Sequence, residues 1–316
     1  MANYRAGDVI RLTRNAVGMT QEQLSEGICS VETLSRIENG KHAVKQSVYG
    51  QLMARMERDT RKSYAVCISK DMELMEERIW LEDAVSKHEY ERAEIYLDIV
   101  KRKIEDSSIS RQYVERLEGV VGYRLGRIGA EELVQKLEKA IRITVPDYEC
   151  HLYIENKERV YPFTELEIYT LMSLANAYGY IEQPHKSIQI YEALLLCLKA
   201  GYIDENSAIK LQMVIGGNYG KALEQAGKYQ EALEKAGEVL KLAIINDYGK
   251  MIPPMLLAIS WDMRKICKDS GDNLDDIKDD TQKKLRQAYY IAAARKDNIN
   301  LGIIKKYYLE CFGEEI

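Results

Sequence analysis

The chain has 316 residues, 46% of them hydrophobic, with 5 prolines and a formal net charge of −5 at pH 7. This length exceeds that of one ordinary compact domain unless the chain is a repeat array, and the scarcity of proline together with frequent Leu, Ala, Glu and Lys favours helices. No apolar run is long enough to span a membrane, and the N-terminus lacks the apolar segment of a signal peptide, so we expect a cytoplasmic protein.

The residue types that carry metal or catalytic chemistry are scattered. The 6 cysteines include no C-x-x-C pair, and the 4 histidines show no ligand spacing with cysteine or carboxylate. No nucleophile stands in a recognisable arrangement with a base. We therefore expect reduced thiols, no metal, no cofactor and no enzymatic activity.

Charge is distributed unevenly along the chain. Residues 1–62 contain ten Lys and Arg against seven Asp and Glu, whereas the remainder contains 35 against 43. A basic small end on an acidic body suggests that only this end meets a polyanion.

Residues 1–62 predict four helices. The first begins at about Arg5 and ends at Gly18, and the fourth spans residues 46–56. Between them, Thr20 is a predicted N-cap, with Gln23 three residues later completing a capping-box pattern. Ser30 is the predicted N-cap of the third helix. We expect the second and third helices to have about eight residues each and to be joined by one or two residues, so that they cross steeply.

Two helices that cross in this way form a helix-turn-helix, whose second helix can enter the major groove of DNA. Short polar side chains on that helix let the backbone approach, and Arg36 can reach a guanine edge or a phosphate. The first backbone amides of the preceding helix face a phosphate, and Glu32 can accept from a cytosine amino group or cap its own helix. A protein-interaction module is the alternative. The candidate DNA contacts are Thr20, Gln21, Ser30, Val31, Glu32, Thr33, Ser35, Arg36 and Lys41.

The runs TQEQLSE and SRIENG resemble the lambda/Cro-repressor class of DNA-binding domains, often called XRE-like. The resemblance implies a buried ion pair between Arg14 and Glu38, and a glutamine that opens the second helix, as Gln21 does. That class usually has a glycine at the turn, whereas here one residue is missing and Cys29 follows Ile28 directly. The shortened turn resembles a narrower group, the PlcR/Rgg-type regulators.

Residues 63–316 predict degenerate helical hairpins. The run AGKYQEALEKAGEVL (226–240) resembles the second half of a tetratricopeptide repeat, in which two antiparallel helices occupy 34 residues. If Met213 is counted as position 1 of this repeat, the small residues Gly220 and Ala232 fill positions 8 and 20, where the two helices approach each other. Further matches start at Leu74, Val114 and Ile168, and more helices are expected from about Pro254. We therefore expect an all-α chain, with a helix-turn-helix bundle in 1–62 and an α-solenoid of about five tetratricopeptide-like hairpins in 63–316.

The first helix of each repeat lines a concave surface, and such surfaces bind extended peptides. Because an asparagine side chain can donate to and accept from a peptide backbone at once, the asparagines on this surface are the leading candidates. They could instead hydrogen-bond to neighbouring loops. The candidate peptide-binding residues are Tyr169, Met172, Asn176, Asn218 and Lys221.

The resemblance to PlcR/Rgg-type regulators implies a transcription regulator that binds a double-stranded DNA operator as a homodimer and senses a short signalling peptide, as in quorum sensing. Two alternatives remain. The repeats could serve a protein partner or dimerisation only, or the chain could be a scaffold that regulates a phosphotransfer protein.

Overall fold

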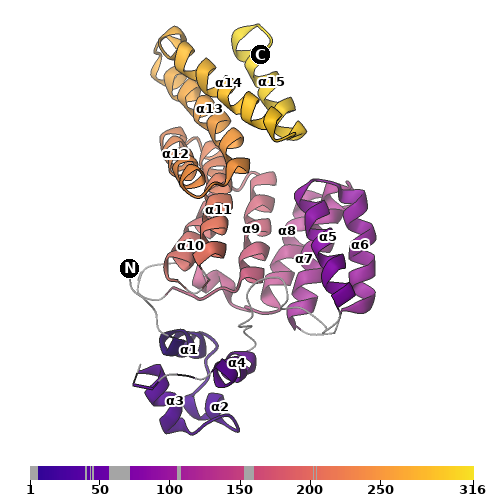
Figure 1. Ribbon diagram of the computed structural model, residues 1–316, viewed down its shortest axis with the longest axis vertical. Coiled ribbons are helices and arrows are strands. Elements are labelled where there is room, and N and C mark those ends of the chain that lie inside the picture. The colour runs from indigo at the N-terminus through magenta and orange to yellow at the C-terminus, as the bar shows by residue number, and fades with distance from the viewer. Residues whose placement is uncertain are drawn as a thin grey trace. The chain divides into compact units, whose positions relative to one another are not determined.

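The structure, a computed structural model, describes residues 6–39, 41–42, 44, 46–56, 72–104, 108–152, 160–201, 203 and 205–316. These residues form fifteen α-helices and short 3-10 turns, and the described parts contain no β-strand (Figure 1). The expected fold class is confirmed: a helix-turn-helix bundle is followed by helical hairpins.

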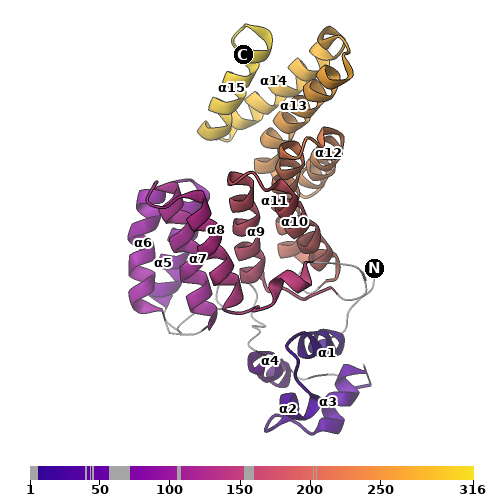
Figure 2. The same cartoon turned by 180° about the vertical axis from the view of Figure 1, so that it is seen from behind.

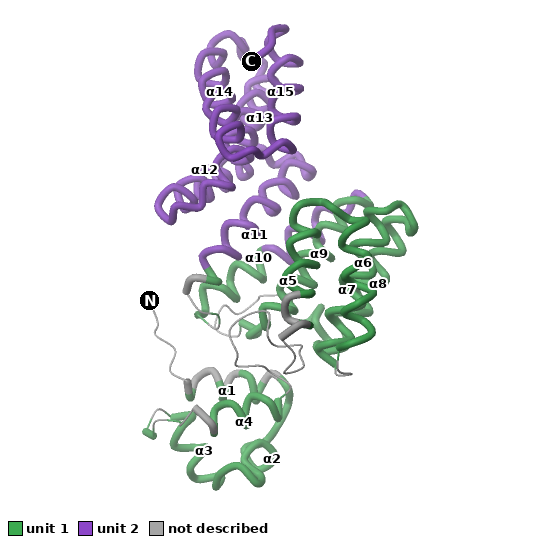
Figure 3. Tube along the Cα trace, turned by 45° about the vertical axis from the view of Figure 1, so that its right-hand side comes forward, with its two compact units in different colours: residues 1–181, 192–208 green, residues 182–191, 209–316 purple. Residues whose placement is uncertain are grey.

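The chain divides into two compact units (Figure 3). The first comprises residues 1–181 and 192–208, and the second comprises residues 182–191 and 209–316. The boundary at residues 62 and 63 lies in a segment outside the described residues, so the division into 1–62 and 63–316 stays a prediction.

Four helices build the N-terminal head, and a small apolar core holds them together. Ile10, Leu24, Leu34, Ile37 and Leu52 are buried in one cluster, with Val17, Ile28 and Cys29 packed against it. Each helix contributes at least one of these side chains, so no helix of the head is stable alone. The helices are α1 (Ala6–Ala16), α2 (Gln21–Ser25), α3 (Val31–Glu38) and α4 (Gln46–Arg55).

The connection between α2 and α3 differs from the expectation. Helix α2 has five residues, not about eight, and residues 26–30 join it to α3. The turn does contain a glycine, Gly27. Its φ of 67° lies in the left-handed region, which favours glycine. Ile28 follows this turn and packs on the core instead of extending α2. The prediction of one or two linking residues was wrong, because Gly27 turns the chain away from helix within one residue of the Glu26 C-cap.

The rest of the chain is a series of antiparallel helices joined by short turns (Figures 1 and 2). Counted in sequence order, the successive pairs of helices are α5 and α6, α7 and α8, α9 and α10, α11 and α12, and α13 and α14, and α15 follows; α5 contacts α6 and α7 contacts α8 in the first unit, and α13 contacts α14 in the second. Their bounds are α5 (Met72–Ser86), α6 (Tyr90–Lys103), α7 (Ser108–Arg124), α8 (Ala130–Arg142), α9 (Glu165–Tyr180), α10 (Pro184–Lys199), α11 (Glu205–Gln225), α12 (Tyr229–Ile245), α13 (Ile252–Ser270), α14 (Lys278–Ala294) and α15 (Asn298–Phe312).

The positions that the repeat pattern assigned to the interior are buried. In the first hairpin Leu81, Ala84 and Ala93 are fully buried in one cluster. In the fourth, a Cβ placed on Gly220 of α11 would lie 3.9 Å from the Ala232 carbonyl oxygen of α12. A Cβ at this distance would make ordinary van der Waals contact, so α11 and α12 pack together where repeat positions 8 and 20 meet, as the sequence predicted.

Candidate DNA-binding surface and repeat-domain sites

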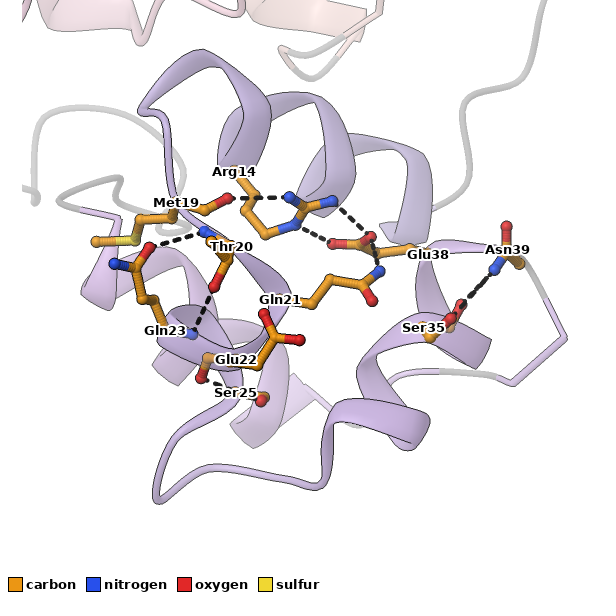
Figure 4. Close-up of polar contacts among 10 residues, drawn as sticks. All are labelled: Arg14, Met19, Thr20, Gln21, Glu22, Gln23, Ser25, Ser35, Glu38 and Asn39. Carbon is orange, nitrogen blue, oxygen red and sulfur yellow. Dashed lines mark hydrogen bonds and ion pairs between the residues drawn. The ribbon is translucent and has the colours of Figure 1, made fainter.

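The start of α2 is closed by a capping box. The Thr20 hydroxyl accepts a hydrogen bond from the Gln23 backbone N–H at 3.2 Å, and the Gln23 side-chain oxygen accepts from the Thr20 N–H at 2.8 Å (Figure 4). The predicted N-cap is confirmed. Because Gln23 occupies the Thr20 N–H, the backbone donors left for a DNA phosphate at this end begin with Gln21.

An ion pair joins the first helix of the head to the third. Arg14 Nε donates to Glu38 Oε1 at 2.7 Å and Arg14 Nη2 donates to Glu38 Oε2 at 2.9 Å, a bidentate geometry (Figure 4). Glu38 is 2% exposed. Arg14 also donates to the Met19 carbonyl at 3.0 Å, so the guanidinium fixes the chain just before α2. The pair is the one implied by the resemblance, and its burial makes it structural.

Gln21, a predicted DNA contact, belongs to the same network. Its side-chain nitrogen donates to Glu38 Oε2 at 2.6 Å (Figure 4). An amide has one donor group and one acceptor group at its end, and here a donor is engaged inside the head. The orientation of the half-buried Gln21 side chain is therefore set by Glu38.

Helix α3 begins at a second cap and exposes one polar face. The Ser30 hydroxyl accepts from the Thr33 N–H at 3.1 Å, and the two hydroxyls lie 2.8 Å apart. Leu34 and Ile37 are buried on the inner side. On the outer side, Ser30, Val31, Glu32 and Arg36 are exposed, Thr33 and Ser35 are half-buried, and Lys41 beyond the helix is exposed.

Within this face, Arg36 is the side chain available to a base or phosphate. No described residue forms a hydrogen bond or ion pair with its guanidinium, whereas Ser35 is engaged by Asn39, whose side-chain nitrogen donates to the Ser35 carbonyl at 2.8 Å. Glu32 stands in the first turn of α3, where a carboxylate is favoured by the helix dipole. The arrangement can present one guanidinium and several hydroxyls to a groove.

A long-range contact that the sequence analysis missed closes the other end of α2. Arg55, at the end of α4, donates to the Leu24 carbonyl at 3.2 Å and also to the Glu26 carbonyl. These acceptors are the carbonyls that the last turn of a helix leaves without partners. A basic residue 31 positions away in sequence gives no local signal for such a cap.

The predicted peptide-binding residues fall into two groups, which lie in different compact units and are described separately. On α9, Tyr169 and Asn176 are half-buried and Met172 is buried, with 7% of its surface exposed. On α11, Asn218 is half-buried and Lys221 is exposed. Met172 is thus less accessible than the prediction supposed, because its side chain packs into the interior of the unit.

Tyr169 lies beside a buried basic residue. The Arg116 guanidinium carbon is 5.7 Å from the centroid of the Tyr169 ring and 5.7 Å from that of Tyr113. Arg116 also donates to Glu82 at 3.0 Å. Burial raises the pKa of the Tyr113 hydroxyl well above its ordinary value, so this ring stays neutral. The Tyr169 ring therefore lies near a buried guanidinium that is already paired with Glu82, a contact within the fold.

A family model matches the N-terminal head of the chain, and solved structures resemble its fold. The sequence model of the family described as "Helix-turn-helix" matches residues 10–60. None of the curated proteins compared with the chain matches it. Among the described helices, none is long and apolar enough to cross a membrane.

Solved structures resemble the chain over nearly its whole length. Bacillus thuringiensis PlcR in complex with the peptide PapR7 and DNA matches with a TM-score of 0.57 at 19% identity, covering 95% of this chain and 98% of that chain. Its apo form gives a TM-score of 0.57 at 16% identity, covering 95% and 97%. ComR from S. thermophilus in complex with DNA and its signalling peptide ComS gives a TM-score of 0.52 at 13% identity, covering 96% and 99%. The chain shares their fold.

Proposed function

We propose that the protein is a sequence-specific DNA-binding transcription regulator whose repeats sense a short signalling peptide. The observation that carries the first half is the α2–α3 pair, in which two capped helices present an exposed polar face with Arg36 at its centre. The helix-turn-helix match to residues 10–60 and the excess of basic residues in 1–62 support the same assignment.

The second half rests on the hairpin repeats and on their likeness in fold to PlcR and ComR, each solved with a peptide and DNA. We assign residues 1–62 to DNA binding and residues 63–316 to peptide sensing and dimerisation. Two heads in a cytoplasmic homodimer would contact half-sites about one helical turn of DNA apart. A peptide regulates such a protein only if it binds the DNA-competent and DNA-incompetent states with different affinities.

The test is a footprint on the DNA upstream of the protein's own gene, with and without short peptides from spent culture medium. We expect protection of two half-sites, and a change in its strength when peptide is added. Absence of any protected sequence would contradict the DNA assignment. Protection that no peptide alters would contradict peptide sensing and favour repeats that serve dimerisation or a protein partner.

A further inference from the structure

Asp262 is a buried charged residue without a partner. It lies in the middle of α13 with 0% of its surface exposed, and neither of its carboxylate oxygens has a hydrogen-bond partner among the described residues. A buried ionised carboxylate that lacks both an ion pair and hydrogen bonds is costly, so a native protein has a reason to keep one. Leu256 and Ile259 of the same helix are buried in apolar clusters, of which Asp262 is not a member.

The neighbours of Asp262 increase this cost. Helix α11 packs against α13, since a Cβ on Gly217 would lie 3.3 Å from the end of the Met255 side chain, and Glu224, two turns further along α11, is the charged group that acts on Asp262. Burial raises the pKa of Asp262 to about 8, and Glu224 acts in the same direction. Burial also raises the pKa of Glu224 to about 7, opposed by Lys221 one turn earlier. Both carboxyls therefore hold protons readily near neutral pH.

The basic residues of α13 do not neutralise the pair. The Arg264 guanidinium lies 5.1 Å from the centroid of the Phe312 ring, and the Lys265 ammonium lies 5.2 Å from that of Trp261. Cys311 and Arg264 adjoin Tyr307 and not Asp262 itself. Lys221 acts on Glu224, but no described residue forms an ion pair or a hydrogen bond with the carboxylate of Asp262.

Glu224 gives the pair an opening to solvent. It is half-buried, and with Met213 counted as position 1 of its repeat it stands at position 12, a position of the first helix that in such repeats normally faces the concave surface. We propose that Glu224 and Asp262 receive one ammonium group of a ligand, either the N-terminal amino group or a lysine side chain of a peptide. The ammonium donates to both carboxylates, and its charge replaces the protons that they otherwise share. This proposal names the ligand chemistry of the sensing function proposed above and rests on it.

The variant that tests the site is Glu224→Gln combined with Asp262→Asn, which removes both charges and keeps the side-chain size. Its matched control is Glu231→Gln combined with Asp269→Asn, because both of these carboxylates are exposed on the same unit, on α12 and α13. Both proteins are used as the full chain.

The first measurement needs no peptide. Thermal unfolding is followed at pH 8 with 1,4-diaminobutane, and tetramethylammonium chloride at equal ionic strength serves as the blank. We expect the diamine to raise the midpoint of the wild type and of the control variant by about 2 °C or more and to leave the double variant unchanged. An equal rise in all three proteins would overturn the site, and the same rise with calcium chloride in place of the diamine would identify a metal site instead.

The second measurement uses randomised heptapeptides, half of the library with free and half with acetylated N-termini, selected on the protein and identified by mass spectrometry. We expect the wild type to enrich peptides with a free amino group or lysine at least tenfold over those without, and the double variant to lose this preference. If the wild type enriched peptides regardless of a free amino group or a lysine, the ammonium site would be refuted and peptide sensing would remain. Enrichment of no peptide, with the diamine effect still present, would refute peptide sensing while leaving the site intact.

The pH profile then separates the two sources of the ammonium. Binding should strengthen from pH 6 to pH 8 as the carboxyls lose their protons. A lysine ligand keeps its charge and holds this affinity at pH 9, whereas an N-terminal amino group, with a pKa near 8, loses its charge and its affinity. A profile that is flat from pH 6 to pH 9 would overturn the assignment of the pair.

Discussion

The side-chain nitrogen of Gln21 lies 2.6 Å from Glu38 Oε2, and this contact ties the first residue of α2 to the last residue of α3. The same carboxylate receives Arg14 from α1. Three helices of the head therefore meet at one buried acid. This geometry separates two kinds of polar residue in the head: Gln21 and Glu38 hold helices together, whereas Arg36 is exposed and is the residue that we propose to contact DNA.

Arg36→Ala is expected to weaken operator binding by about 1–3 kcal/mol, because the guanidinium is exposed and no described residue holds it. The measurement is fluorescence anisotropy with a footprinted operator fragment at matched salt. Lys306→Ala, which removes an exposed charge from α15, is the control and should leave affinity unchanged. Equal affinity of the Arg36 variant and the wild type would remove Arg36 from the site.

Glu38→Ala is expected to destabilise the head by about 3 kcal/mol, because it leaves the Arg14 guanidinium partly buried without its partner. Hydrogen exchange of the full chain, followed by mass spectrometry, should show faster exchange in α1, α2 and α3 while α13 and α14 are unaffected. The control is Glu91→Ala, since Glu91 is exposed on α6, outside the head. Slow exchange throughout the Glu38 variant would show that the ion pair contributes little.

Gly7→Ala tests how closely α1 approaches α3. A Cβ on Gly7 would collide with the Ile37 carbonyl oxygen, a backbone atom that cannot turn aside. Separation of the two helices should cost the head about 1–3 kcal/mol and weaken DNA binding with it. Gly237→Ala on α12, where a Cβ meets no atom, should be neutral or stabilising. A Gly7 variant as stable as the wild type would refute the close approach.

Asn176→Ala is expected to leave the DNA affinity of the peptide-free protein intact and to reduce the response to the cognate peptide. The variant loses a side-chain amide that can donate to and accept from a peptide backbone. Calorimetry with that peptide is the measurement. The exposed Gln225 of α11, changed to Ala, is the control. Full peptide affinity in the Asn176 variant would place the peptide elsewhere.

Asp262→Asn is expected to alter the pH dependence of stability. The pKa of Asp262 is raised in the folded chain, so its contribution to folding is complete at acid pH and is lost as pH rises toward and through about 8. The variant cannot ionise at this position and should therefore exceed the wild type in stability at pH 8.5, by about 1–3 kcal/mol. Urea unfolding at pH 5 and pH 8.5 measures the difference. If the free energies of unfolding of the variant and the wild type differed by the same amount at pH 5 and pH 8.5, ionisation of a buried Asp262 would not be the cause.

The elements predicted correctly from the sequence are those whose cause is local. The caps at Thr20 and Ser30 depend on residues three positions away, and the hairpins follow from small and large side chains at fixed repeat positions. The short α2 was missed because Gly27 was not recognised as the residue that ends it. Arg55 and Asp262 were missed for a different reason. Their roles depend on helices distant in sequence. The spacing of residues along the chain does not show which carbonyl or carboxylate the fold brings near them.

Helix α2 has five residues, too few for its own backbone hydrogen bonds to maintain it in water. It persists because Thr20 and Gln23 close one end and Arg55 of α4 closes the other. The stability of α2 therefore depends in part on α4, the last helix of the head. A displacement of α4 that removes the Arg55 donors would leave the last carbonyls of α2 without these partners, and we expect α2 to fray from that end.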